Sequence, residues 1–134
     1  MKAYIQGIGS YVPAKRMSND DLAKIVDTSD EWIYSHTGIK NRHIAADDEA
    51  ASDLAFNASR DALAAAGKSG ADLDMIIVAT ATPDHLGFPS TACILQDRLG
   101  AERAAAMDIS AACTGFIYGL DTARAFIEAG IHKN

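Results

Sequence analysis

The sequence predicts an α/β fold, in which helices alternate with the strands of a largely parallel sheet. Two apolar runs, residues 75–79 and 104–109, have the composition of strands buried on both faces, and Asp108 alone breaks the second run. Stretches with apolar side chains at helical spacing precede, separate and follow these runs. This order is typical of parallel strands joined by right-handed crossovers, and binding sites in such sheets lie at the carboxyl ends of the strands.

The chain begins with a predicted strand. Residues 2–12 are rich in apolar and aromatic side chains, and Pro13 ends the run. Gly7 and Gly9 interrupt it, and a residue without a Cβ inside a strand permits a bulge or the close approach of another backbone. We therefore expect a bulge or a close backbone contact there.

Two short helices and an edge strand are predicted next. Residues 18–21, Ser-Asn-Asp-Asp, resemble a capping box with Asp in the place of Glu, which begins the first helix. Thr28 or Ser29 is suited to cap the second helix, which is about two turns long and ends at Gly38. Residues 39–44 then predict a short edge strand, with Lys40 and Arg42 on its outer face.

Two further helices are predicted, one before and one after the strand at residues 75–79 in the sequence. Residues 50–66 have high helix propensity, and small alanines on the face toward the sheet would let this helix pack closely. Residues 89–99 form the other predicted helix, which Gly100 closes. Cys93 lies inside that helix, and we interpret it as a packing residue. The side chains expected to face the sheet from the first of these helices are Leu54, Ala58, Ala62 and Ala65.

Cys113 occupies the position around which the rest of the chain is organised. It follows the strand at residues 104–109 through a turn of small residues, and it begins a mostly apolar helix predicted over 113–129. The first amides of a helix have no intrahelical partner and the helix dipole is positive at this end, so both favour a thiolate. A thiolate is a nucleophile, and the small neighbouring side chains leave space for an acyl group. A buried packing cysteine is the alternative interpretation. The apolar stripe predicted for this helix consists of Phe116, Leu120, Ala123 and Ile127.

Trp32 is the second candidate site residue. It lies on the first turn of its predicted helix, among charged and polar neighbours. In one interpretation the indole packs onto the core beneath it. In the other, the indole provides a stacking surface for a flat ring.

Composition argues against several classes of protein. The net charge of −6 argues against nucleic-acid binding, and no apolar stretch is long enough to span a membrane. Cys93 and Cys113 are too few for a disulfide framework, and they fit the reducing setting of the cytoplasm. The four histidines are scattered and no CxxC pair occurs, so we expect no metal site.

Five segments occur in the order and spacing of one enzyme family and span nearly the whole chain. They are residues 7–13 (GIGSYVP), 27–33 (DTSDEWI), 37–42 (TGIKNR), 88–90 (FPS) and 108–116 (DISAACTGF). Together they resemble the N-terminal half of β-ketoacyl-acyl-carrier-protein synthase III, the initiating condensing enzyme of type II fatty acid synthesis. The resemblance favours Cys113 as the nucleophile.

The resemblance implies a thiolase-like fold, layered α/β/α/β/α, in which residues 1–134 form the N-terminal half-domain of a homodimer subunit. It implies that Cys113 accepts an acyl group, typically acetyl, from coenzyme A, and that this group is condensed with malonyl-acyl-carrier protein. Thr28 and Trp32 match residues that contact the coenzyme A adenine. Phe88 matches a loop residue that reaches the acyl pocket of the dimer partner. Coenzyme A thioester is then a substrate, and no cofactor is expected.

The chain departs from the family at one site residue and lacks others. Position 36 is His, where some members have an Arg beside the adenine, and the two side chains differ in stacking and in phosphate contacts. The catalytic His and Asn belong to the second half of the family's proteins. We therefore expect residues 1–134 to be inactive alone, as a fragment of a longer polypeptide or as one of two chains. No catalytic role is assigned to the histidines His36, His43, His85 and His132.

Other functions and one surface stay open at this point. A thiolase-fold acyltransferase of polyketide or quinolone synthesis would share the cysteine. A non-catalytic module that binds coenzyme A or acyl groups would need no activated thiol. The acidic carrier protein should meet a basic patch, of which Lys40 and Arg42 are at most an edge.

Overall fold

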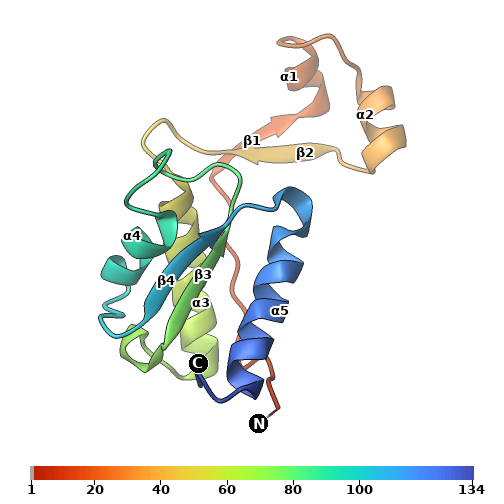
Figure 1. The fold of residues 1–134 in the computed structure, drawn as a ribbon. Coiled ribbons are helices and arrows are strands. Elements are labelled where there is room, and N and C mark those ends of the chain that lie inside the picture. The colour runs from red at the N-terminus through yellow and green to blue at the C-terminus, as the bar shows by residue number, and fades with distance from the viewer. Residues whose placement is uncertain (1) are drawn as a thin grey trace. The chain divides into compact units, whose positions relative to one another are not determined.

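The computed structural model describes residues 2–134, and the chain divides into two compact units (Figure 1). The hairpin unit is Val12–Glu49, and the sheet unit comprises Ala50–Asn134 together with the residues before Val12. That residues 1–134 form one half-domain stays a prediction.

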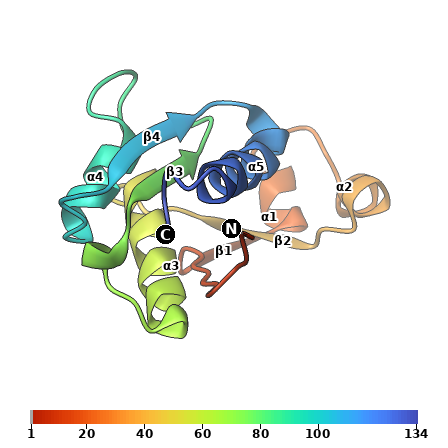
Figure 2. The ribbon, with the colours of Figure 1, turned by 60° about the horizontal axis from the view of Figure 1, so that its bottom comes forward.

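The sheet unit has helices on both faces of a parallel pair of strands. Strand β3 pairs with β4 in register from Met75 opposite Ala105 to Ala79 opposite Ile109. Helices α3 and α4 contact each other on one face, and α5 lies on the other face (Figures 1 and 2). The elements are α3 (Ala51–Ala66), the 3-10 turn η1 (Gly70–Asp72), β3 (Met75–Ala79), α4 (Thr91–Arg98), β4 (Ala105–Ile109), the 3-10 turn η2 (Ala112–Thr114) and α5 (Gly115–Glu128).

A small apolar core holds the sheet unit together. It lies between β3 and β4 on one side and α4 on the other, and Phe56 of α3 packs against it. The guanidinium of Arg98 bonds Asp53 of α3 at 2.8 Å and lies over the ring of Phe56, so one side chain links α4 to α3. The fully packed members of this core are Ile76, Ala92, Leu95, Ala101 and Ala104.

The predicted strand at residues 2–12 is wrong in this structure, because these residues form no strand. A strand needs a neighbouring strand, and β3 and β4 pair only with each other among the described residues. The predicted close backbone contact is confirmed. A Cβ at Gly7 would overlap the carbonyl oxygen of Ala62, and a Cβ at Gly9 that of Ala58. The small alanines of α3 therefore do allow close packing, against the N-terminal segment.

The hairpin unit is a two-stranded antiparallel ribbon with two short helices. Strand β1 (Lys15–Ser18) pairs with β2 (Asn41–Ile44), and the connection contains α1 (Asn19–Ala23) and α2 (Asp30–Thr37). Strand β1, whose sequence is KRMS, has no alternation of apolar residues, so its pairing with β2 was not predicted. The edge strand predicted over 39–44 is confirmed over its last four residues.

The predicted helix caps of the hairpin unit are confirmed. The hydroxyl of Ser18 accepts from the backbone N–H of Asp21 at 3.1 Å, and a carboxylate oxygen of Asp21 accepts from the N–H of Ser18 at 3.3 Å. Ser29 rather than Thr28 caps α2, because its hydroxyl accepts from the N–H of Trp32 at 3.1 Å. Gly38 ends α2 with a φ of 70°, a left-handed conformation that glycine adopts without strain.

Three details of the sheet unit differ from the prediction. Helix α4 begins at Thr91, so Cys93 lies in its first turn and is only half-buried, with its N–H bonded to the capping Ser90. Ala65 of α3 is exposed. The predicted apolar stripe of α5 is not fully covered, since Phe116 is 68% and Leu120 is 42% exposed.

Candidate functional site

Cys113 lies at the carboxyl end of the sheet, as its sequence position predicts. It is the middle residue of η2, the single 3-10 turn that joins β4 to α5, and its side chain is exposed. The α-helix begins at Gly115 rather than at Cys113. The thiol therefore stands just before the first turn of α5, where the helix amides have no intrahelical partner and the dipole is positive. The packing interpretation of this cysteine does not fit its exposure.

The backbone beside the thiol is strained. Ala112 has a φ of 45°, and among the described residues it is the one non-glycine residue with a positive φ. Such conformations cost about 1–3 kcal/mol and persist where the surrounding structure enforces them. Here the enforcing contacts are the backbone N–H and the hydroxyl of Thr114, which both donate to the carbonyl oxygen of Ala111, at 3.2 and 2.8 Å. The turn thus presents Cys113 in a fixed position.

Gly115 fixes the start of α5 against the sheet. It is buried, and a Cβ at this position would lie 3.3 Å from the Cβ of Ala79, at the carboxyl end of β3. A larger residue would force the helix away from the strand end. The glycine at position 115 therefore allows the close approach of α5 to the sheet.

Asp108 joins two elements of the sheet unit, a role that its sequence position did not reveal. Its two carboxylate oxygens accept from the backbone N–H groups of Thr91 and Ala92, at 2.9 and 2.8 Å. A carboxylate at a helix N-terminus satisfies unpaired amides and interacts favourably with the dipole, so Asp108 fastens α4 to β4. The signal in the sequence was a charged residue inside an otherwise apolar strand.

Phe88 projects from a loop whose base is fixed. The side chain of Phe88 is 96% exposed. At the base of the loop, a carboxylate oxygen of Asp84 accepts from the N–H of Ser52 at 2.9 Å, and the N–H of Asp84 donates to the buried hydroxyl of Thr91 at 3.1 Å. An exposed aromatic side chain on an anchored loop is suited to contact another molecule.

In the hairpin unit, Thr28 and Trp32 line one hollow. Its volume is about 370 Å³, and Asp27 and Ser29 complete the lining. The indole of Trp32 is 58% exposed, so it is not a core residue. The hydroxyl oxygen of Thr28 is buried and has no hydrogen-bond partner among the described residues, which is uncommon for a buried polar atom. The hollow therefore has an open aromatic face, and one of the residues that line it carries an unsatisfied hydroxyl.

His36 stacks on Trp32 one helical turn away. The two ring centroids lie 4.5 Å apart, with an interplanar angle of 25°. Nδ1 of His36 donates to the carbonyl oxygen of Trp32 at 2.7 Å, which holds the imidazole in place. His36 does not line the hollow, and its imidazole supports the indole by stacking on it.

The two basic residues expected at the edge of a carrier-protein surface are both engaged. The ammonium of Lys40 lies 5.0 Å from the ring centroid of Tyr34, a cation–π contact. The guanidinium of Arg42 turns inward to bond the carbonyl oxygens of Met17 and Ser18, at 3.3 and 2.9 Å. The expectation that Arg42 lies on the outer face is therefore wrong, because these carbonyl groups and the side chain of Asn19 capture it.

Within residues 2–134, no three His, Cys, Asp or Glu side chains are grouped so that they could hold a metal ion. In the same part of the chain, no helix combines the length and the apolar character needed to cross a membrane.

Comparison with known proteins supports the resemblance that the five segments carry. The model of the family described as 3-oxoacyl-[acyl-carrier-protein (ACP)] synthase III matches residues 107–134, the part that contains Cys113. The chain is 58% identical over 129 residues to the β-ketoacyl-[acyl-carrier-protein] synthase III of Xanthomonas oryzae, covering 96% of this chain and 39% of that protein. The corresponding protein of Neisseria meningitidis is 59% identical over 133 residues, with 98% and 41% covered.

Solved structures confirm the thiolase-like fold. The 3-oxoacyl-[acyl-carrier-protein] synthase III of Aquifex aeolicus superposes with a TM-score of 0.90 at 52% identity, over 96% of this chain and 41% of that one. The priming β-ketosynthase of the R1128 polyketide pathway superposes with a TM-score of 0.88 at 37% identity, over 94% and 37%. The chain thus spans about two fifths of the length of the relatives it matches.

Proposed function

We propose, on the premise that this chain is the N-terminal part of a member of the β-ketoacyl-acyl-carrier-protein synthase III family, that the complete protein is a condensing acyltransferase. In the first step the Cys113 thiolate attacks the thioester carbonyl of an acyl-coenzyme A, for which acetyl-coenzyme A is the proposed donor. Coenzyme A leaves as a thiolate, which takes a proton from solvent. In the second step malonyl-acyl-carrier protein loses carbon dioxide, and its carbanion attacks the acyl-cysteine. The products are a β-ketoacyl-carrier protein and the regenerated thiolate.

The observation that carries this proposal is the geometry of η2. An exposed thiol precedes a helix N-terminus, on a turn that contains a strained alanine and is packed against the end of the sheet. Strained residues and reactive cysteines both concentrate at functional sites. The backbone N–H of Cys113 is also available near the thiol to stabilise an oxyanion on the acyl group.

The hollow in the hairpin unit supports coenzyme A as the acyl carrier. The exposed face of Trp32 suits the adenine ring, since stacking needs a flat aromatic surface and no hydrogen-bond readout. Thr28, whose hydroxyl has no hydrogen-bond partner among the described residues, lines the same hollow. Both residues are those that the family resemblance assigns to the adenine. Phe88, fully exposed on its anchored loop, suits the proposed contact with the acyl pocket of a second subunit.

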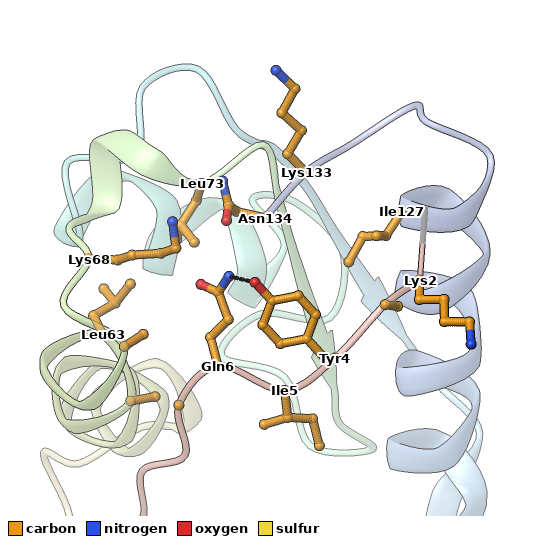
Figure 3. Close-up of a pocket in the computed structure, with 14 residues that line it drawn as sticks. Lys2, Tyr4, Ile5, Gln6, Leu63, Lys68, Leu73, Ile127, Lys133 and Asn134 are labelled. Carbon is orange, nitrogen blue, oxygen red and sulfur yellow. Dashed lines mark hydrogen bonds between the residues drawn. The ribbon is translucent and has the colours of Figure 1, made fainter.

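Several exposed surfaces of the sheet unit support the proposal that other residues of the complete protein pack against residues 1–134. The side chains at the start of α5 include Phe116, Ile117 and Tyr118, each more than half exposed. A groove of about 340 Å³ lies between the N-terminal residues, the end of α3 and Asn134 (Figure 3). At that end the N–H of Asp74, which directly precedes β3, donates to the carbonyl oxygen of Asn134 at 3.0 Å. We infer that residues 1–134 alone carry no condensing activity, because the carbanion-stabilising His and Asn and part of the pocket come from outside them.

The test is to trap the acyl-enzyme in the complete protein. Incubation with acetyl-coenzyme A, without malonyl-carrier protein, should add one acetyl group, and peptide mass analysis should place it on Cys113. Limited iodoacetamide should likewise label Cys113 before Cys93, and acetylation should protect it. Acetylation elsewhere, or no covalent adduct at all, would contradict the proposal and favour a non-catalytic coenzyme A-binding module.

A second candidate function is priming of polyketide synthesis. The match to a priming β-ketosynthase, at 37% identity, supports this alternative. The first step and Cys113 are shared by both functions, so the two differ in the carrier protein that brings the malonyl group. Comparing the rate of the complete protein with carrier proteins of the two pathways would separate them.

A further inference from the structure

Asn19 is a buried polar side chain of the hairpin unit. It is 1% exposed and begins α1. Its amide nitrogen donates to Oδ1 of Asp30 at 2.7 Å and to the carbonyl oxygen of Ile39 at 2.8 Å. Its amide oxygen accepts from the guanidinium of Arg42. Both N–H bonds and the oxygen of this one side chain are therefore used, by three residues that are distant in sequence.

Two of these partners flank α2. Asp30 is the first residue of the helix, and Ile39 follows Gly38, the residue that caps its end. The side chain of Asn19 thus bonds both ends of the helix that carries Trp32. Arg42 completes the connection, because its other nitrogen bonds the backbone of β1.

Helix α2 buries little of its own surface. It is eight residues long, and Ile33 is its one buried residue. Isolated helices of fewer than about 12–15 residues are marginal in water, so tertiary contacts must hold such a helix. The position of Trp32 therefore depends on the packing of Ile33 and on the bonds from Asn19.

We propose that Asn19 is a positioning residue for the nucleotide end of acyl-coenzyme A. By bonding both ends of α2, it fixes the indole of Trp32 and the hollow beside Thr28 in the geometry that an adenine ring needs. The inference rests on the proposed function, and it adds a residue that acts through Trp32 without contacting the ligand. None of the five family segments contains Asn19.

The experiment compares two acyl donors with the complete protein. Acetyl-coenzyme A carries the adenine nucleotide, whereas acetyl-pantetheine carries only the thiol-bearing arm. Asn19→Ala should raise the dissociation constant of coenzyme A by up to about 5- to 150-fold, the range of one base–aromatic stack. The kcat/KM for acetyl-pantetheine should stay unchanged. Combining Asn19→Ala with Trp32→Ala should weaken binding no more than Trp32→Ala alone, because the two residues act as one unit.

Matched variants guard against a loss of folding. Asp30→Ala truncates an exposed partner of Asn19 and should reproduce the loss of affinity, whereas Asp30→Asn keeps the acceptor oxygen and should retain affinity. Ser52→Ala truncates a buried polar side chain of the sheet unit, and it should lower the melting temperature without changing coenzyme A binding. If Asn19→Ala does not fold, the comparison of Asp30→Ala with Asp30→Asn tests the positioning role.

The outcomes separate this inference from the proposed function. Equal losses with both acyl donors would overturn the positioning role, since they would indicate a general structural defect. Unchanged coenzyme A affinity in the Asn19 and Asp30 variants, with a loss in Trp32→Ala, would overturn the inference alone. Unchanged affinity in Trp32→Ala would overturn the adenine contact itself, and the inference with it.

Discussion

The sheet unit and the hairpin unit hold their candidate site residues by different forces. In the sheet unit, Cys113 stands on a turn that follows β4, and β4 packs against the apolar core of Ile76 and Leu95. In the hairpin unit, Trp32 stands on a short helix whose ends are both bonded by the buried amide of Asn19. Apolar packing is non-directional, whereas a hydrogen-bonded amide specifies positions and angles.

The difference fits the chemistry proposed for each site. A nucleophile must be held rigidly within reach of a carbonyl carbon. The packed strands of the sheet unit, at whose carboxyl end Cys113 lies, provide this rigidity. A stacking platform needs an exposed face, so its helix cannot bury much apolar surface. A buried polar network positions such a helix without covering Trp32. We therefore expect apolar truncations to affect the sheet unit most and polar truncations to affect the hairpin unit most.

The largest expected effect comes from the nucleophile. Cys113→Ala in the complete protein should lower the rate of condensation by at least about 10⁴-fold, since removal of a catalytic nucleophile costs this much in other enzymes. The melting temperature should change little because the side chain is exposed. Steady-state kinetics with acetyl-coenzyme A measure the effect. Cys93→Ala is the matched control, and activity that depends on Cys93 instead would contradict the site.

A core truncation should separate the two units. Leu95→Ala removes a side chain that is 3% exposed and should destabilise the sheet unit by about 2–5 kcal/mol. Native-state hydrogen exchange should then show reduced protection of the amides of β3 and β4. The amides of β1 and β2 should keep their protection. An equal loss of protection in both pairs of strands would show that the units unfold together, and it would contradict the difference proposed between them.

Truncating the indole should affect binding and leave stability largely intact. Trp32→Ala should weaken coenzyme A binding by about 1–3 kcal/mol, measured by calorimetric titration, because one base–aromatic stack is lost. Tyr34→Ala is the control on the same helix, since its ring contacts Lys40 and does not line the hollow. Similar losses of affinity in both variants, or unfolding of the Trp32 variant, would indicate that the role of Trp32 is structural.

A smaller effect is expected from the imidazole that supports the indole. His36→Ala removes the stacked ring and should weaken coenzyme A binding by about 0.5–1.5 kcal/mol, the range of an aromatic pair. The same titration with dephospho-coenzyme A tests how the effect arises. If the loss disappears without the 3′-phosphate, His36 acts on the phosphate and the supporting role is wrong.

The smallest effect concerns acid and the capping box of α1. The side chains of Lys24 and Ser18 bond Asp21 and lower its pKa from 3.8 to about 2. A lowered pKa stabilises the fold fully above the unfolded value, and the contribution is lost as pH falls from about 4 to 2. Carboxyl chemical shifts in NMR would follow the titration.

The effect of salt tests the contribution of Lys24. Salt should raise the pKa of Asp21 more than the pKa of Asp72. The pKa of Asp72 is lowered chiefly by the N–H of Ser69, whereas the carboxylate of Asp21 forms an ion pair with Lys24. Equal salt responses would argue against the role of Lys24.

Local patterns in the sequence predicted most of the regular structure. The apolar run at Met75–Ala79, the capping residues Ser18 and Ser29, and the stop at Gly38 act through neighbours a few residues away, so they can be recognised without knowledge of the fold. Cys113 was found in the same way, because a turn of small residues between a strand and a helix is a local pattern.

Features that depend on distant partners were missed or misplaced. Strand β1 has no apolar alternation and exists because β2 pairs with it, whereas residues 2–12 have the composition of a strand and no partner strand among those described. Arg42 was expected to face outward, but Asn19 and two carbonyl groups hold it inside. No local signal could show either outcome, since each depends on which groups the folded chain brings together.

The sequence by itself determined where the helices and buried strands lie, and it determined which residues are candidates for chemistry. Only the tertiary structure decided how those residues are held: the left-handed Ala112 beside the thiol, the carboxylate of Asp108 on α4, and the amide of Asn19 at both ends of α2. The physical reason is the range of the interactions. Propensities and caps act within a few residues, whereas the hydrogen bonds of Asp108 and Asn19 form only where the fold brings distant parts of the chain together.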